Sequence, residues 1–272
     1  ALSAKGGAVF NEDSADVDFR VESNGNANML FVDGGNNRVG IGSATPTKVL
    51  DITESASADT GQLKLTYDGG DGNRAGFILK NTHTGGREYG IYAGNNSTGG
   101  GLGNSLGIAD NTASTAYRLL IDSAGAVTMP SQPAFHAHKN GTDQNNFATG
   151  GATIVWAAER FDNNADFDLT ENRFVAPVTG KYFLQVNVRF GAVDTAAAYY
   201  ILEIITSNQN YNFIIDPNFS ADLNYMTASV TVLADMDASD TAIIAVNQNG
   251  GTAQTDIDGN QVYTWYSGHL VC

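Results

Sequence analysis

Residues 181–190, Lys-Tyr-Phe-Leu-Gln-Val-Asn-Val-Arg-Phe, alternate apolar and mixed side chains with a period of two. Successive side chains of a β-strand point to opposite faces, so Tyr182, Leu184, Val186 and Val188 share one apolar face. The stretch therefore predicts a long strand with one buried face.

Short apolar stretches separated by polar turns continue through the second half of the chain, without an amphipathic helix pattern. Roughly nine or ten strands at this spacing predict an all-β fold, a jelly-roll sandwich or barrel. The expected strands are 134–138, 154–156, 173–175, 181–190, 199–206, 211–215, 226–233, 241–247 and 262–271.

Composition divides the chain at Ser131. Of the 31 glycines 22 precede this residue, whereas 18 of the 26 aromatic residues follow it. The first part is therefore poor in material for a compact core, and the second part is rich in it. We expect an N-terminal attachment segment at 1–15, a Gly-rich β-repeat segment at 16–130 and a jelly-roll head at 131–272.

Three stretches of the first half, 19–25, 30–35 and 119–125, share one pattern of an apolar strand, an acidic residue and a Gly-bearing turn. A second short strand follows two of these turns, which predicts hairpins. A hairpin alone is marginally stable in water, so the segment needs identical copies or a stacked array to pack against. Further short strands are expected at 62–67, 76–80 and 88–92, and a solvent loop at 94–103.

The net charge is −15, and the chain has only 14 Lys and Arg residues. Phosphate recognition needs clustered basic residues, so nucleic acid is excluded as a partner. No apolar run approaches the roughly 18 residues that span a bilayer, which excludes membrane insertion. The start of the chain has no apolar core of a secretory signal, unless one was removed. Cys272 is the single cysteine, so no intrachain disulfide forms.

His136 and His138 flank Ala137 on the first expected strand of the head and so point to the same face. In a trimer they would present six imidazoles near the axis, a candidate metal site. The alternative is that both are solvent-facing or hydrogen-bonded residues of an interface.

Two acidic turns are candidate calcium sites, because hard cations take clustered oxygen ligands. One holds Asp235, Asp237 and Asp240, and the other is 256–260. Neither fits the twelve-residue calcium loop, so ordinary solvated turns are the favoured interpretation. No nucleophile elbow or zinc-binding His-Glu-x-x-His motif occurs, and we expect neither catalysis nor an organic cofactor.

Residues 19–52, with the stretches 38–47 and 50–52, resemble the shaft repeats of bacteriophage tail fibres, as does 118–128. In that family the repeat precedes a trimeric tip; here Ser43 stands where Thr is usual. The resemblance implies a trimeric shaft or collar on a virion. The His-x-His pair on the first strand of the head also resembles pairs that hold iron in some trimeric fibre tips. A Gly-rich flexible linker is the alternative for the N-terminal half.

Four stretches of the second half, 133–135, 161–164, 174–183 and 263–271, resemble the globular heads of the complement q subcomponent and the related tumour-necrosis-factor jelly rolls. Order and spacing agree over about 140 residues. The resemblance implies a homotrimer packed around a threefold axis, and calcium at the end of some heads. His269 departs from the pattern, because an aromatic residue commonly stands there. The core or trimer-forming residues implied are Phe135, Phe174, Tyr182 and Tyr266.

Together these features predict a virion structural protein, exposed on the virion surface and so extracellular. The N-terminus would bind other virion proteins, and the head would bind a host-surface glycan or protein. Two alternatives remain: a capsid decoration or cement fibre that stabilises the particle, and a secreted cellular adhesin or lectin.

Overall fold

The computed structural model of the chain describes residues 10, 13–54, 63–68, 73–95, 102–113 and 116–272. Its residues group into two compact units, Ala1–Gly69 and Gly70–Cys272. Most of the predicted attachment segment lies outside the described residues, as does most of the predicted loop at 94–103. The boundary at Ser131 stays a prediction. Within the described part of the chain, no helix is long and apolar enough to cross a membrane.

The first unit contains one small sheet with the strand order β1-β2-β3-β4. Strands β1, β2 and β3 pair antiparallel, which confirms the predicted hairpins, and β3 pairs parallel with β4. Gly42 takes a φ of +75° and a side chain there would meet the Thr53 carbonyl, so this turn requires glycine. The strands are β1 (Phe19–Ser23), β2 (Asn26–Asp33), β3 (Arg38–Ile41) and β4 (Leu50–Ile52).

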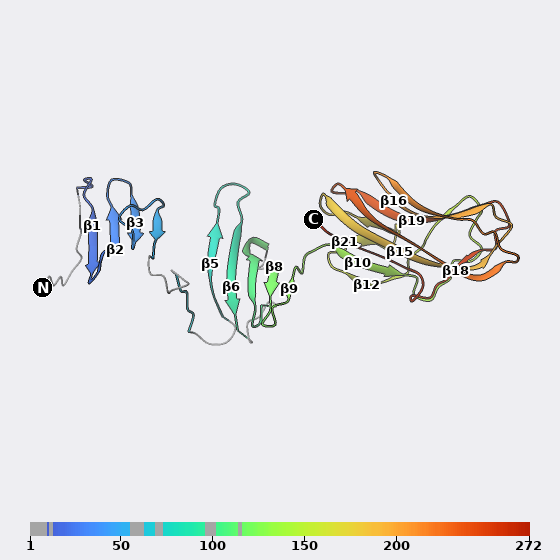
Figure 1. The fold of residues 1–272 in the computed structure, drawn as a ribbon, viewed down its shortest axis with the longest axis horizontal. Coiled ribbons are helices and arrows are strands. Elements are labelled where there is room, and N and C mark those ends of the chain that lie inside the picture. Colours follow the sequence, from blue (N-terminus) through green and yellow to red (C-terminus); the bar gives the residue numbers. More distant parts are fainter. Residues whose placement is uncertain (1–9, 11–12, 55–62, 69–72, 96–101, 114–115) are drawn as a thin grey trace. The chain divides into compact units, whose positions relative to one another are not determined.

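The second unit begins with an antiparallel five-stranded sheet in simple sequence order, which Figure 1 shows in green. Its elements are β5 (Arg74–Lys80), β6 (Glu88–Gly94), β7 (Leu106–Asp110), β8 (Ala116–Ile121) and β9 (Val127–Thr128), with the short 3-10 turn η1 (Asn111–Ala113). The predicted strands at 76–80 and 88–92 are confirmed as parts of β5 and β6. The predicted strand at 62–67 is wrong, because Leu63–Tyr67 form no strand.

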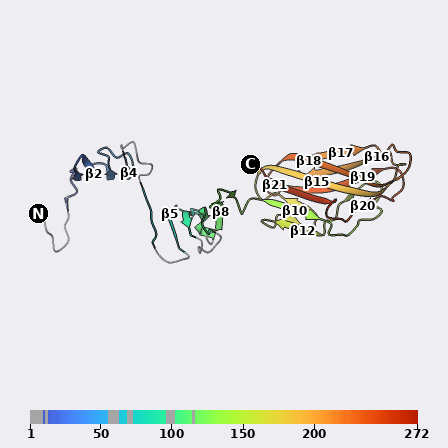
Figure 2. The same cartoon turned by 60° about the horizontal axis from the view of Figure 1, so that its bottom comes forward.

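Two further sheets stack face to face as a sandwich (Figures 1 and 2). One has the order β12-β10-β21-β15-β18, with β20 beside β15; the other has the order β13-β14-β19-β16-β17, with β11 beside β19. The first sheet comprises β10 (Ala134–His138), β12 (Ala158–Asp162), β15 (Gly180–Val193), β18 (Leu223–Met236), β20 (Asp256–Ile257) and β21 (Trp265–Leu270). The second comprises β11 (Ala152–Thr153), β13 (Phe167–Asp168), β14 (Arg173–Val175), β16 (Tyr199–Thr206), β17 (Asn210–Ile215) and β19 (Thr241–Asn249).

The order of the long strands is that of a jelly roll. Along the chain most successive strands alternate between the two sheets, and the hairpins β13–β14 and β16–β17 each lie within the second sheet. This crossing pattern makes the two interlocked Greek keys of the fold. The predicted jelly-roll head is therefore confirmed.

The inward-facing side chains of β15 lie in the core of the sandwich. Tyr182, Leu184, Val186 and Val188 are all fully buried, as the period of two predicts. Phe135 stacks on Phe174 with ring centroids 4.7 Å apart and meets Tyr266 edge-on at 4.9 Å. Burying each such side chain stabilises the fold by about 1.5–3 kcal/mol, so this aromatic layer holds the two sheets together.

The predicted strand at 154–156 is wrong as secondary structure, although its side chains are in the core. Ile154 and Trp156 are buried, but they lie in an irregular segment. Ile154 N–H donates to the Ile244 carbonyl of one sheet, whereas Ala157 N–H donates to the His138 carbonyl of the other. The segment crosses between the sheets, so it cannot form a regular ladder with either.

Candidate functional site

His136 and His138 lie on the outward face of the first sheet, where both are paired with β21. The His138 Nδ1 accepts a hydrogen bond of 3.0 Å from the Asn140 N–H. The His136 ring stacks on Trp265 with centroids 5.6 Å apart, and among the described residues its buried Nε2 has no hydrogen-bond partner. Burial lowers the pKa of both histidines, and the Arg160 guanidinium lowers it further.

The described residues contain no group of three or more His, Cys, Asp or Glu side chains placed to hold a metal ion. Two imidazoles from one chain complete no such site, so the metal on a trimer axis stays a prediction.

The carboxylates of the two predicted calcium turns have partners within the protein. Asp235 pairs with Lys181, and the Asp240 carboxylate accepts the Asp237 N–H at 2.8 Å. Asp256 accepts the Asn146 N–H at 2.7 Å, and Asp258 pairs with Arg189. These contacts are those of ordinary Asx-type turns and an ion pair.

The four aromatic residues predicted to form the core or the trimer are fully buried within one chain: Phe135, Phe174, Tyr182 and Tyr266. The Tyr182 hydroxyl donates to the Val178 carbonyl at 2.7 Å, and burial raises its pKa. Burial also raises the pKa of Tyr266. All four therefore belong to the hydrophobic core of the single chain.

The outward face of the first sheet carries an aromatic patch near the end where the chain enters the sandwich. Strand register places Phe161 beside His136, and His269 beside Phe183, which in turn lies beside Leu233. Phe161 is 49% exposed and Leu233 is 58% exposed. We define Phe161, His136, Trp265, Phe183 and Leu233 as the aromatic patch.

At the border of the aromatic patch, Trp265 lies in one row with the polar residues Asn187 and Ser229. Asn187 accepts a hydrogen bond from the Ser229 hydroxyl and donates to the Tyr263 carbonyl. On β15 and β18 these two side chains lie between the aromatic patch and the far end of the sandwich.

At that far end, opposite the entry of β10, Arg189 lies between two tyrosines. Its guanidinium carbon is 3.7 Å from the centre of the Tyr263 ring and 4.7 Å from that of Tyr225. Its Nε donates to the Asp258 carboxylate at 3.0 Å. Cation–π stacking and a charge-assisted hydrogen bond hold the guanidinium rigidly. Tyr225 nevertheless remains 64% exposed.

Two grooves adjoin this cluster. One, of about 470 Å³, is lined by Asn140, Asp143, Arg189, Asp258, Asn260 and Gln261 among others. The second, of about 320 Å³, is lined by Asp143, Asn224, Tyr225, Asp256 and Asp258 among others. We call Arg189, Tyr225, Tyr263 and Asp258, with these grooves, the distal site. It presents exposed aromatic surface beside carboxylate and amide groups, and acidic groups outnumber the arginine.

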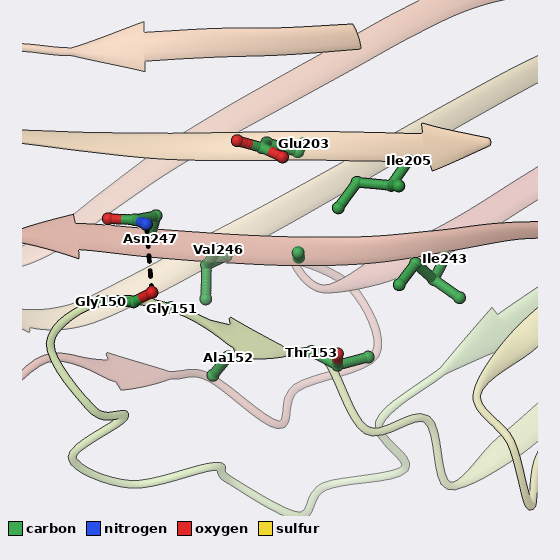
Figure 3. Close-up of a pocket in the computed structure, with 10 residues that line it drawn as sticks. Gly150, Gly151, Ala152, Thr153, Glu203, Ile205, Ile243, Val246 and Asn247 are labelled. Atoms are coloured by element: carbon green, nitrogen blue, oxygen red, sulfur yellow. Dashed lines mark hydrogen bonds between the residues drawn. The ribbon is translucent and has the colours of Figure 1, made fainter. Parts of the chain in front are cut away.

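A third hollow, of about 320 Å³, lies on the outward face of the second sheet (Figure 3). Ile205 and Ile243 form an apolar floor beside Glu203, and the Asn247 amide donates to the Gly150 carbonyl at 3.2 Å across one edge. Glu203 is the charged residue of its lining. Figure 3 shows these side chains spread over the sheet rather than converging on a point, so the distal site is the stronger candidate.

The distal site was not predicted from the sequence. Arg189 is the last outward residue of the alternating stretch, which is a detectable signal. Tyr225 and Tyr263 are 36 or more residues away in the chain, and only the register of β15 with β18 and β21 brings them close.

No protein-family model matches the chain, and no curated protein matches it. Among solved structures it is similar to the globular domain of a zebrafish complement 1qA protein, at 16% identity and a TM-score of 0.39, over 52% of this chain and 98% of that one. It is also similar to murine APRIL, at 10% identity and a TM-score of 0.38, over 52% of this chain and 99% of that one. The jelly-roll assignment itself follows from the strand order of the two sheets.

Proposed function

We propose that this protein is an attachment protein of a virion: a homotrimer whose jelly-roll head binds a neutral glycan of the host surface through the distal site. The observation that carries the binding role is the distal site itself. It lies at the end of the sandwich opposite the point where the preceding chain enters, so its loops are free of the connection to the rest of the protein.

The chemistry of the distal site suits a neutral, hydroxylated ligand. Exposed faces of Tyr225 and Tyr263 offer flat apolar surfaces for the C–H groups of a sugar ring. The neighbouring Asp143, Asp256 and Asp258 offer acceptors for hydroxyl groups. Arg189 is already paired, so the excess of carboxylates disfavours sialylated or phosphorylated ligands.

The aromatic patch supports assembly of the head from copies of the chain. A soluble monomer rarely exposes clustered large apolar side chains. Phe161 and Leu233 are exposed, Phe183 is half-buried, and all three lie on the outward face of the first sheet. Three heads in one trimer present three distal sites, so weak contacts with single glycans gain avidity. The tail-fibre-like repeats of the N-terminal half support mounting on a virion.

Binding of the full-length protein to immobilised neutral oligosaccharides tests the proposal. We expect Tyr225→Ala to weaken binding by about tenfold or more, as for an aromatic anchor. Phe213→Ala is the matched control, because Phe213 is also an exposed aromatic residue, on β17 of the other sheet. Failure to bind any neutral glycan, or equal binding by the Tyr225→Ala protein, would contradict the proposal. Loss of particle stability on removing the protein, without loss of attachment, would favour a capsid decoration fibre.

A further inference from the structure

On one face of the five-stranded sheet β5–β9 the chain packs a small core of its own. Tyr92, Ala109 and Tyr117 are buried there together with Leu102. The Arg74 guanidinium lies 4.1 Å above the Tyr92 ring and donates to the Tyr117 hydroxyl at 2.7 Å. We call this the tyrosine face; its aromatic rings are covered and its hydroxyls have partners.

The opposite face is aliphatic and open. Strand register places Phe77, Ile91, Ile108 and Leu119 in one row across four strands. The adjacent rows add the large apolar residues Leu106, Ile121 and Val127 on one side and Leu79 and Tyr89 on the other. We call these nine residues the aliphatic face.

The exposed area of the aliphatic face is large for a soluble monomer. Six of its residues are between 37% and 61% exposed: Phe77, Leu79, Tyr89, Leu106, Ile108 and Val127. Together they expose on the order of 500 Å² of apolar surface, at the upper end of what soluble monomers show. That area is a large part of the roughly 800 Å² that each partner buries in a standard stable interface.

The carboxylate of Asp110 on this face is paired within the chain. Asp110, 2% exposed, is paired with Arg87 and lies 3.4 Å from the Arg118 guanidinium. These pairs lie at one edge of the apolar rows. Apart from Asp110 and its two arginines at that edge, the described residues of these rows are uncharged. Two copies of the aliphatic face can therefore meet along these rows without bringing like charges together, although the whole chain carries a net charge of −15.

We propose that the aliphatic faces of three copies of this chain pack against one another around a threefold axis, making a second assembly core separate from the head. This inference rests on the homotrimer of the proposed function. Ile108, at the middle of the central strand β7, would lie close to that axis.

The occupant is a copy of the chain because the sheet depends on it to fold. Among the residues that the structure describes, the tyrosine face buries four, Tyr92, Leu102, Ala109 and Tyr117, which is too small a core for five strands. A partner must therefore be present whenever the chain folds, and another copy of the same chain always is. Such obligate interfaces resemble a protein core cut in half, as this face does.

Cross-linking of the full-length protein tests the contact. In a Cys272→Ser background, Ile108→Cys should give covalent trimers with a short tris-maleimide reagent on denaturing gels. Ile78→Cys is the matched control, because Ile78 is 55% exposed but lies on the other face of the sheet; it should give no trimer. A trimer by light scattering that shows no Ile108 cross-link would overturn the proposal.

Limited trypsin digestion gives a second measurement that needs no cysteine. Lys80, Arg87 and Arg118 are cleavage sites within this sheet. Phe77→Glu should speed cleavage there by about tenfold relative to Ile78→Glu, because only Phe77 lies on the aliphatic face. Equal rates for the two variants would contradict the packing. Neither readout depends on glycan binding. Glycan binding by the head can therefore be disproved while the packing of the aliphatic faces is supported, and the packing can be disproved while glycan binding is supported.

Discussion

Two buried tyrosines of the jelly roll differ in what their hydroxyls contact. The Tyr200 hydroxyl accepts the Asp194 N–H at 2.9 Å and lies 2.8 Å from the Thr255 hydroxyl. Among the described residues, the Tyr266 hydroxyl has no hydrogen-bond partner. A buried hydroxyl without a partner costs desolvation energy, whereas a bonded one contributes stability.

Removing these two hydroxyls should therefore have opposite effects on stability. Tyr266→Phe should leave the free energy of unfolding unchanged or raise it by about 1 kcal/mol, and Tyr200→Phe should lower it by about 1–2 kcal/mol. Denaturant unfolding of both variants, followed by tryptophan fluorescence, measures the difference. A marked loss of stability in Tyr266→Phe would show that its hydroxyl has a partner such as a buried water molecule.

Lys139 is a buried cation at the start of the loop after β10. Its Nζ donates to the Val155 carbonyl at 3.0 Å, and burial lowers its pKa from 10.5 to about 8. Above pH 8 the folded protein loses this proton while the unfolded chain keeps it until about pH 10.5. The unfolded state then binds more protons, so this residue makes stability rise with pH in that window.

The stability of the Lys139→Met protein should lack that rise with pH. The difference in melting temperature between the variant and the wild type should therefore favour the variant least at the alkaline end of the window. Melting temperatures measured from about pH 7 to about pH 9.5 test this. Lys181→Met serves as the control, because the Lys181 side chain is 45% exposed. Parallel pH profiles for the wild type and Lys139→Met would contradict the assignment.

At the scale of elements, the sheet β5–β9 depends on glycines beneath its tyrosines. A Cβ at Gly90 would lie 2.0–2.2 Å from atoms of the Tyr92 ring, and a Cβ at Gly107 would lie 2.8 Å from the Tyr117 ring. These rings therefore lie flat on bare backbone. The glycines leave room for the two tyrosine rings, and the rings cover the backbone on this face of the sheet.

Gly90→Ala should displace the Tyr92 ring and destabilise this sheet by about 1–3 kcal/mol. Hydrogen exchange should accelerate in residues 74–128 and stay unchanged in 134–270, because the jelly roll has its own core. The double variant Gly90→Ala with Tyr92→Ala should recover part of the protection by removing the clash. Unchanged exchange in Gly90→Ala would mean that the ring does not lie on this glycine.

At the scale of the whole molecule, the aromatic patch and the aliphatic face each expose large apolar side chains that a second copy of the chain would bury. We expect light scattering on the intact protein to give three times 28.6 kDa. Substituting one surface, by Phe161→Glu or by Ile108→Glu, should weaken the trimer, and substituting both should give monomers at micromolar concentration. A wild-type monomer in dilute native buffer would contradict both assembly surfaces.

The sequence was most informative where one face of a strand is buried by neighbours in the same chain. Strands β10, β14 and β16 begin and end where the alternation predicted. The segment 154–156 was misassigned because its apolar side chains reflect burial, not backbone pairing. β7 and β12 were not predicted, since glycine and charged residues interrupt their apolar patterns.

By itself, the sequence determined the all-β class, the long alternating strand β15 and the glycine-rich hairpins. Each of these depends on side-chain type and on spacing along the chain. Only the tertiary structure decided that Arg189 lies between Tyr225 and Tyr263, and that nine large apolar residues share one open face of β5–β9. The physical reason is that the register between distant segments sets which residues are cross-strand neighbours. That register depends on all strands burying their apolar faces in the same core, which no single segment specifies.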